Sequence, residues 1–88
     1  MMWEFVREFP TPPMEEVEDF GVRVAEILDE LNVEPKEDLT QWDYAISVGS
    51  MRVDAPVLIV TDKRTEEMHL LVYDGKKQKV LVYGGREE

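Results

Sequence analysis

His69 is the only histidine of the chain and the first residue to consider for acid–base or metal chemistry. Glu67 precedes it by two positions, so the two side chains share one face if this stretch is a strand. A general base needs a partner that orients it, and a metal ion needs more than two protein ligands. Cysteine is absent, which excludes thiolate ligands. We therefore predict no catalytic residue, no metal site and no cofactor.

Asp74, Gly75 and Lys76 match the end of the PD-(D/E)xK nuclease pattern, with Asp54 or Asp62 as the upstream acid. In that chemistry carboxylates hold a divalent ion and a lysine orients the attacking water. The second acid and the lysine of the pattern lie within a strand, whereas Asp-Gly between two apolar runs is typical of a turn. We therefore interpret residues 74–77 as a turn.

Aromatic residues and lysines in the second half of the chain are of the types that stack on and neutralise single-stranded nucleic acid. They are Trp42, Tyr44, Tyr73, Tyr83, Lys76, Lys77 and Lys79. Packing in a core or an interface explains the aromatic residues more simply. The net charge of −10 would also repel phosphates, so we do not expect direct binding to nucleic acid.

The element that must position any site is a helix predicted over residues 11–32. Thr11 suits the N-cap, Pro12 suits the first helical position, and Asn32 suits the end. Gly21 falls on the buried side, where we expect it to allow the close approach of a strand. The apolar positions recur at steps of three and four residues, as in an amphipathic helix: Met14, Val17, Phe20, Val24, Ile27, Leu28 and Leu31.

The opposite face of this helix carries the candidate binding residues. At about 100° per residue, Glu15, Asp19, Val22, Glu26 and Asp29 lie along one line. Like charges four residues apart cost a few tenths of a kcal/mol per pair. Two interpretations are open: a solvated face that keeps the protein in solution, or a docking strip for a basic protein partner with Val22 as a small apolar anchor.

Strand patterns fill most of the remaining chain, at residues 2–9, 43–48, 51–61, 67–73 and 78–83. The two strands around Gly49-Ser50 form a predicted hairpin with a type II′ turn. Its register pairs Val48 with Met51, Ile46 with Val53, and Tyr44 with Ala55, and it sets Ser47 opposite Arg52 and Ala45 near Asp54. Pro56 is expected at a bend or bulge, because proline removes a ladder hydrogen bond.

Residues 57–60, 70–73 and 80–83 are apolar at every position, so both faces of these strands require cover. One helix covers one face. Either the sheet curls round the helix or the second face is buried against another copy of the chain. The uncovered side chains are then Leu71 with Leu81, or Val72 with Val82.

Length, charge and composition limit the class of protein. A chain of 88 residues without cysteine is expected to be one domain, residues 1–88 with a frayed tail at 84–88, in the reducing cytoplasm. Neither a signal peptide nor a membrane span is expected. Residues 1–43 carry thirteen acids and three bases, whereas residues 44–88 carry seven of each. Scarce Asn and Gln beside 34% charged residues resemble a thermophile's usage.

These patterns predict an α+β protein: one amphipathic helix on a mostly antiparallel sheet of four to five strands, in the order β-α-β-β-β-β. The expected function is a small acidic protein–protein interaction module that acts as a homodimer. One alternative is a nucleic-acid mimic, an acidic inhibitor of a nucleic-acid-binding protein. The other is a small-ligand binder or enzyme with a pocket between the helix and the sheet.

Overall fold

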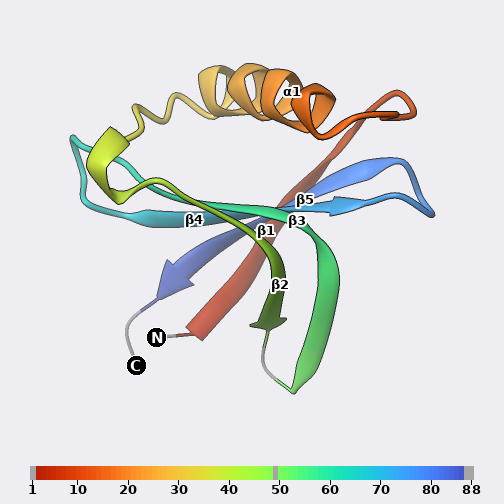
Figure 1. The fold of residues 1–88 in the computed structure, drawn as a ribbon. Coiled ribbons are helices and arrows are strands. Elements are labelled where there is room, and N and C mark those ends of the chain that lie inside the picture. The colour runs from red at the N-terminus through yellow and green to blue at the C-terminus, as the bar shows by residue number, and fades with distance from the viewer. Residues whose placement is uncertain (1, 49, 87–88) are drawn as a thin grey trace.

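A computed structural model describes residues 2–48 and 50–86 of the chain. The described residues form one antiparallel sheet in the strand order β1-β5-β4-β3-β2, with one α-helix lying across it (Figure 1). The predicted α+β class and the order β-α-β-β-β-β are confirmed. The elements are β1 (Met2–Pro10), α1 (Val17–Glu30), a short 3-10 helix η1 (Glu37–Leu39), β2 (Gln41–Val48), β3 (Met51–Thr61), β4 (Met68–Asp74) and β5 (Lys79–Arg86).

Helix α1 begins later than the sequence predicts. Its N-cap is Glu16, not Thr11, and the predicted first turn is not helical. The reason is the Pro12-Pro13 pair, because a residue that precedes proline is disfavoured in helical conformation. The backbone N–H of Thr11 instead donates to the carbonyl of Gln78 at 3.0 Å, which attaches this segment to the β4–β5 turn.

The end of α1 follows the prediction at Asn32. This residue has a φ of 59° and donates its N–H to the Asp29 carbonyl, while the Val33 N–H donates to the Leu28 carbonyl at 2.9 Å. The two hydrogen bonds form a Schellman motif, in which asparagine tolerates the left-handed conformation. Val33 and Leu28 are both buried, so the motif also fixes where the chain leaves the helix.

The main core lies between α1 and the sheet. Phe20 and Leu28 are buried, as the helical stripe predicts, and Met14 and Leu31 pack at its margin. The strands contribute alternate residues to this core, as a pleated sheet requires. The buried members are Phe9, Phe20, Val24, Ile27, Leu28, Val33, Leu58, Val60, Leu71, Val80 and Val82.

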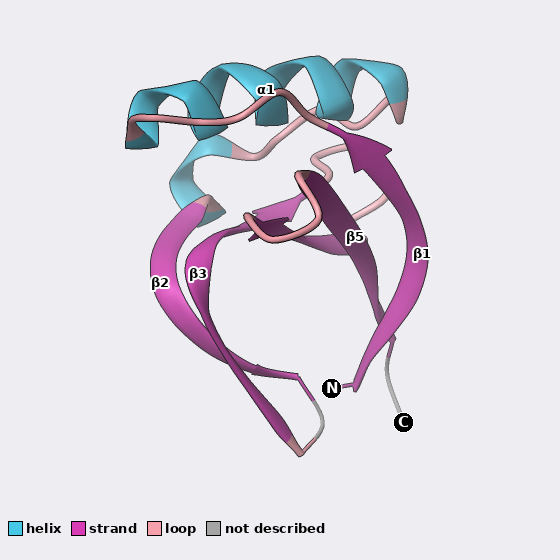
Figure 2. Ribbon diagram, turned by 90° about the vertical axis from the view of Figure 1, so that its right-hand side faces the viewer, coloured by secondary structure: helices cyan, strands magenta, loops and turns pink. Residues whose placement is uncertain are grey.

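The second apolar face is buried by curvature of the sheet. Figure 2 shows the sheet bent into an open trough, with α1 on its outer side and the two edges curving toward each other on the far side. Val57, Leu70 and Val72 are buried in the trough, where Trp3 and Tyr83 pack against them. The sheet therefore curls away from the helix, not round it as one of the two expectations held.

The register of β4 with β5 corrects the predicted pairing of faces. Leu71 lies opposite Val82 and packs toward α1, whereas Val72 lies opposite Leu81 and packs in the trough. Leu71 and Leu81 therefore lie on different faces, as do Val72 and Val82. The tail was also expected to fray from residue 84, but β5 continues to Arg86 by pairing with β1, and residues 87–88 are outside the described part.

Two irregularities accompany the bend. In β1 the register shifts at Val6, and in β3 two residues, Ala55 and Pro56, lie opposite Tyr44. The bulge at Pro56 is as predicted, and it removes the expected pairing of Tyr44 with Ala55. The remaining hairpin pairs are confirmed from Ala45–Asp54 to Val48–Met51. The predicted type II′ turn contains Gly49, which lies outside the described residues.

Burial of the trough within a single chain gives a test. Leu70 is fully buried there, so Leu70→Ala should lower the free energy of unfolding by about 2–5 kcal/mol. Chemical denaturation should give the same loss at every protein concentration, because no second chain is needed to bury this side chain. A loss that grows with concentration would show that Leu70 is covered by another copy.

Candidate protein-binding surfaces

The five residues of the predicted docking strip do not form one continuous row on the face of the helix. Glu15 lies before the helix, and Asp19 is a capping residue whose Oδ2 accepts the backbone N–H of Glu15 at 3.1 Å and of Glu16 at 3.2 Å. An acceptor at this position satisfies backbone N–H groups that a helix start leaves free. Glu15 and Asp19 are therefore not a repulsive pair on a helix face.

The other three members of the strip remain exposed on α1 but differ in surroundings. The Glu26 carboxylate lies 3.9 Å from Arg23, whose guanidinium donates to the Pro10 carbonyl at 2.7 and 3.1 Å. Val22 is 65% exposed. It points away from the core and borders a separate hollow together with Arg23 and Glu26. From the helical angles, Gly21 and Ala25 lie on the opposite flank from Arg23, toward strand β2, with Asp29 beside Ala25.

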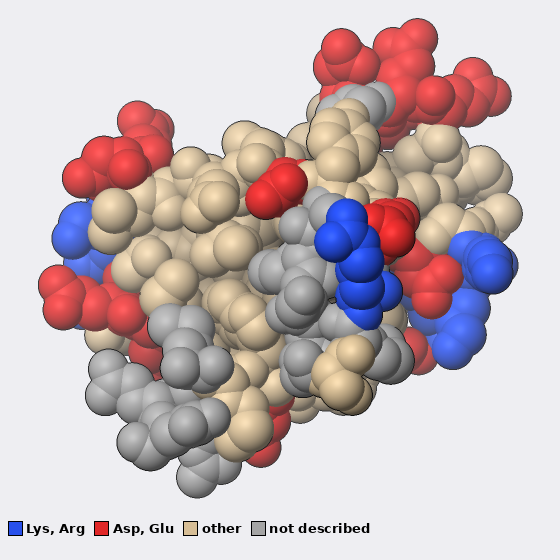
Figure 3. Space-filling view, turned by 60° about the horizontal axis from the view of Figure 1, so that its bottom comes forward, with Lys and Arg blue, Asp and Glu red and all other residues tan. Residues whose placement is uncertain are grey.

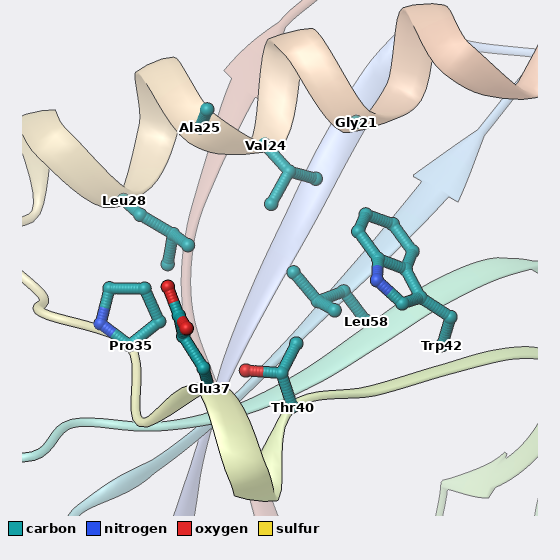
Figure 4. Close-up of a pocket in the computed structure, with 9 residues that line it drawn as sticks. All are labelled: Gly21, Val24, Ala25, Leu28, Pro35, Glu37, Thr40, Trp42 and Leu58. Carbon is teal, nitrogen blue, oxygen red and sulfur yellow. The ribbon is translucent and has the colours of Figure 1, made fainter.

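A groove runs along that flank, between α1 and the start of β2 (Figure 4). It has a volume of about 390 Å³ and is lined mainly by apolar side chains. Helix α1 forms one wall, and the segment through η1 to Trp42 forms the other. The lining residues are Gly21, Val24, Ala25, Leu28, Pro35, Glu37, Thr40, Trp42 and Leu58.

Gly21 keeps this groove open. A Cβ atom at this position would have the Trp42 ring as its nearest neighbour, at 3.9 Å, which is an ordinary contact distance. The predicted close approach of a strand at Gly21 is therefore wrong. The missing side chain leaves space beside the Trp42 indole, which packs edge-to-face on Phe20 with a centroid distance of 5.8 Å.

Exposed large apolar side chains gather at the two edges of the sheet. Seven such side chains in the described part of the chain are more than half exposed. One group, here called the β1 patch, is Met2, Phe5 and Val6. The other, here called the β2 patch, is Leu39 in η1 with Trp42 and Tyr44 in β2, and Val22 is exposed separately on the outward face of α1. The sequence shows these residues but not that they fall into two groups, because the grouping depends on the strand order.

His69 and the Asp74-Gly75-Lys76 segment, which the sequence offered as candidates for chemistry, lie within a strand and a turn of the fold. His69 is half-buried in β4, between Val60 of β3 and Gly84 of β5. Within residues 2–48 and 50–86 no group of three or more His, Cys, Asp or Glu side chains could hold a metal ion. Asp74 Oδ1 accepts the N–H groups of Lys76 and Lys77 at 3.1 and 3.2 Å, so the Asp-Gly segment is a turn, as interpreted.

The aromatic residues do not form one stacking surface. Phe20 lies between Trp42 and Tyr73 on the helix side of the sheet, with centroid distances of 5.8 and 6.3 Å. Tyr83 instead contacts Phe5 edge-to-face at 5.7 Å, on the trough side.

The pKa of the Asp62 carboxyl is lowered from its ordinary value. It is buried at the loop between β3 and β4, and its Oδ1 accepts the backbone N–H of Arg64 at 2.8 Å. That hydrogen bond, assisted by the Arg64 guanidinium at 3.6 Å, lowers the pKa of the carboxyl, although burial acts in the opposite direction. Because the partners belong to the same loop, we interpret Asp62 as a structural residue.

Comparison with known proteins gives no assignment: no family model, no curated protein and no solved structure matches the chain. The helices in the described part of the chain are too short or too polar to cross a membrane.

The space at Gly21 gives a second test. Gly21→Ala should raise the free energy of unfolding by about 1 kcal/mol, because alanine is favoured in helices and its Cβ meets no close neighbour. Ala25→Gly, one turn further along the same wall, is the matched reverse change and should lower it by a similar amount. Urea denaturation of both variants provides the measurement, and a destabilising Gly21→Ala would contradict the groove geometry.

The lowered pKa of Asp62 has a pH consequence. A carboxyl whose pKa is lower in the folded than in the unfolded chain stabilises the fold above its ordinary pKa. That contribution is lost as the pH falls through the folded value. Asp62→Asn should therefore lower the free energy of unfolding at pH 7. As the pH falls below about 4, the variant should lose less stability than the wild type does. Thermal melts between pH 7 and 2 measure this, and parallel wild-type and variant curves would contradict it.

Proposed function

We propose that this chain is a small cytoplasmic protein–protein interaction module that forms a homodimer. The observation that carries the proposal is the β1 patch. Met2, Phe5 and Val6 are each more than half exposed on one edge strand. Phe5 packs against Tyr83 on the trough side, and Val6 lies beside Gly84 on the opposite face. Exposed apolar groups of this kind favour association when they are contiguous. The absence of cysteine is consistent with a cytoplasmic location.

Local charge favours self-association at β1 in spite of the net charge of −10. Glu8 is paired with Lys79 at 2.6 Å, and the Arg7 guanidinium lies 4.3 Å above the Phe9 ring. A two-fold contact sets the same residues of both chains near one another, so a locally neutral strand suits it. Acids of the α1–β2 side would instead meet their own copies, which is repulsive.

The mouth of the trough extends the apolar surface beyond β1. In Figure 3 residues other than Asp, Glu, Lys and Arg cover much of the visible face, and charged side chains lie both at its margins and within it. Phe5 joins the two regions because it packs against Tyr83 in the trough. A stable interface buries roughly 800 Å² per partner, so the dimer contact has to extend from the β1 patch to neighbouring residues.

Sedimentation equilibrium tests the dimer. At tens of micromolar the wild-type protein should give twice the chain mass of 10.3 kDa, and Val6→Lys should give 10.3 kDa, because a buried lysine at the interface is costly. Val22→Lys is the matched control on α1 and should retain the dimer mass. Circular dichroism should show both variants folded. A wild-type mass of 10.3 kDa, or equal masses for both variants, would contradict the proposal.

A further inference from the structure

The two edges of the sheet differ in their capacity to accept another strand. An edge strand exposes unpaired backbone N–H and C=O groups, and a bulge on that strand hinders pairing. Strand β1 carries such a bulge at Val6. At the other edge the extra residue belongs to β3, which places Ala55 and Pro56 opposite Tyr44, so β2 itself continues without an inserted residue. The outer side of β2 is the regular edge.

The groove lies directly beside this regular edge. Trp42 belongs to β2 and lines the groove, and its indole faces Phe20 on the helix side of the sheet. In an added strand, alternate side chains would face the same side as Trp42. One of them would enter the space that Gly21 leaves open, with Ala25 and Leu28 along the helix wall.

The rim of the groove is acidic. Glu37 lines the groove and Asp38 follows it in η1, whereas Asp43 follows Trp42 in β2 and faces the other side of the sheet; all three acids are exposed. In the described structure none of the three forms an ion pair. Glu18 and Asp29 add two exposed carboxylates on the adjacent flank of α1. Such a rim favours a segment that carries lysine or arginine.

From these three observations we infer that the α1–β2 groove binds an extended basic segment of another protein. The segment pairs with β2 as an additional strand and inserts an apolar side chain between Gly21 and Trp42. Its alternate side chains face the same side of the sheet as Asp43 and are basic. Main-chain hydrogen bonds supply affinity in this mode, and the side-chain pocket supplies specificity.

A second copy of this chain does not suit the groove. Strand β2 and the loop before it would bring Glu37, Asp38 and Asp43 close to the same carboxylates of the other chain. Binding at the groove is also separable from the proposed homodimer, because β1 and β2 are opposite edges of the sheet. Of the predicted docking strip, Asp29 lies on the flank of α1 next to this site, whereas Val22 does not line it.

A nine-residue synthetic peptide with capped ends, in which lysine alternates with valine, is a suitable probe. Titration followed by backbone amide NMR should shift resonances of residues 41–44, of Gly21 and Ala25, and of the Trp42 indole. A peptide with glutamate in place of every lysine tests charge. A peptide with proline in place of the central valine tests strand pairing, because proline lacks the N–H. Neither control peptide should bind.

Variants of the protein separate the pocket from the charge. Gly21→Leu fills the groove with a good helix former, and it should weaken binding by at least about tenfold, as loss of an anchor pocket does, with no loss of thermal stability. The exposed pair Glu37→Lys and Asp43→Lys should abolish binding of the lysine peptide and create binding of the glutamate peptide. Val6→Lys should leave the peptide affinity unchanged, whatever it does to the sedimentation mass.

Several results would overturn this site. They are failure of the lysine peptide to bind at millimolar concentration, shifts centred on β1, equal binding of the proline peptide, and wild-type affinity in Gly21→Leu. Because the sedimentation mass of Val6→Lys is measured separately, loss of the dimer and loss of the groove site are distinguishable.

Discussion

Helix α1 covers the sheet face that carries Leu58, Leu71 and Val82, and the described chain has no second α-helix for the face that carries Val57, Leu70 and Val72. Leaving three strands of valine and leucine in water on that side would cost more than bending the sheet, since burial contributes roughly 25 cal/mol per Å². The trough follows from this constraint. The bulges at Val6 and at Ala55–Pro56 lie in the strands that curve, and bulges increase local bending and twist.

A trough that stays open has two consequences for binding. Its two edge strands keep unpaired backbone groups, which a closed barrel would not have. Its outer side also curves away from the straight axis of α1, so the contact between helix and sheet thins toward the edge at β2. The groove at Gly21 and Trp42 lies at that place. The same bend that buries the second apolar face thus opens a cleft beside the regular edge.

The sequence predicts best where local chemistry decides the conformation. Asn32 ends the helix because asparagine tolerates a positive φ, and the β2–β3 register follows from its alternating pattern. The predicted helix start at Thr11 is wrong for an equally local reason. Pro13 disfavours a helical conformation at Pro12, and this outweighs the N-cap preference of Thr11. The faces of β4 and β5 required the register across the turn at 75–78, which pairs Leu71 with Val82. Because residues 70–73 and 80–83 are all apolar, the sequence pattern does not indicate which residue of β4 lies opposite which residue of β5.

The candidate site was less predictable than the fold, because it joins segments whose proximity depends on strand order. The acids of α1 are visible in the sequence, but Asp19 and Glu26 are engaged with the helix start and with Arg23, which breaks the even row that a mimic of phosphates requires. Among the described residues, Glu37, Asp38 and Asp43 have no ion-pair partner and lie near Trp42 and Tyr44 at the β2 edge. A partner that binds these carboxylates must contact the helix flank and the edge strand at once, and an extended chain lying between them does so.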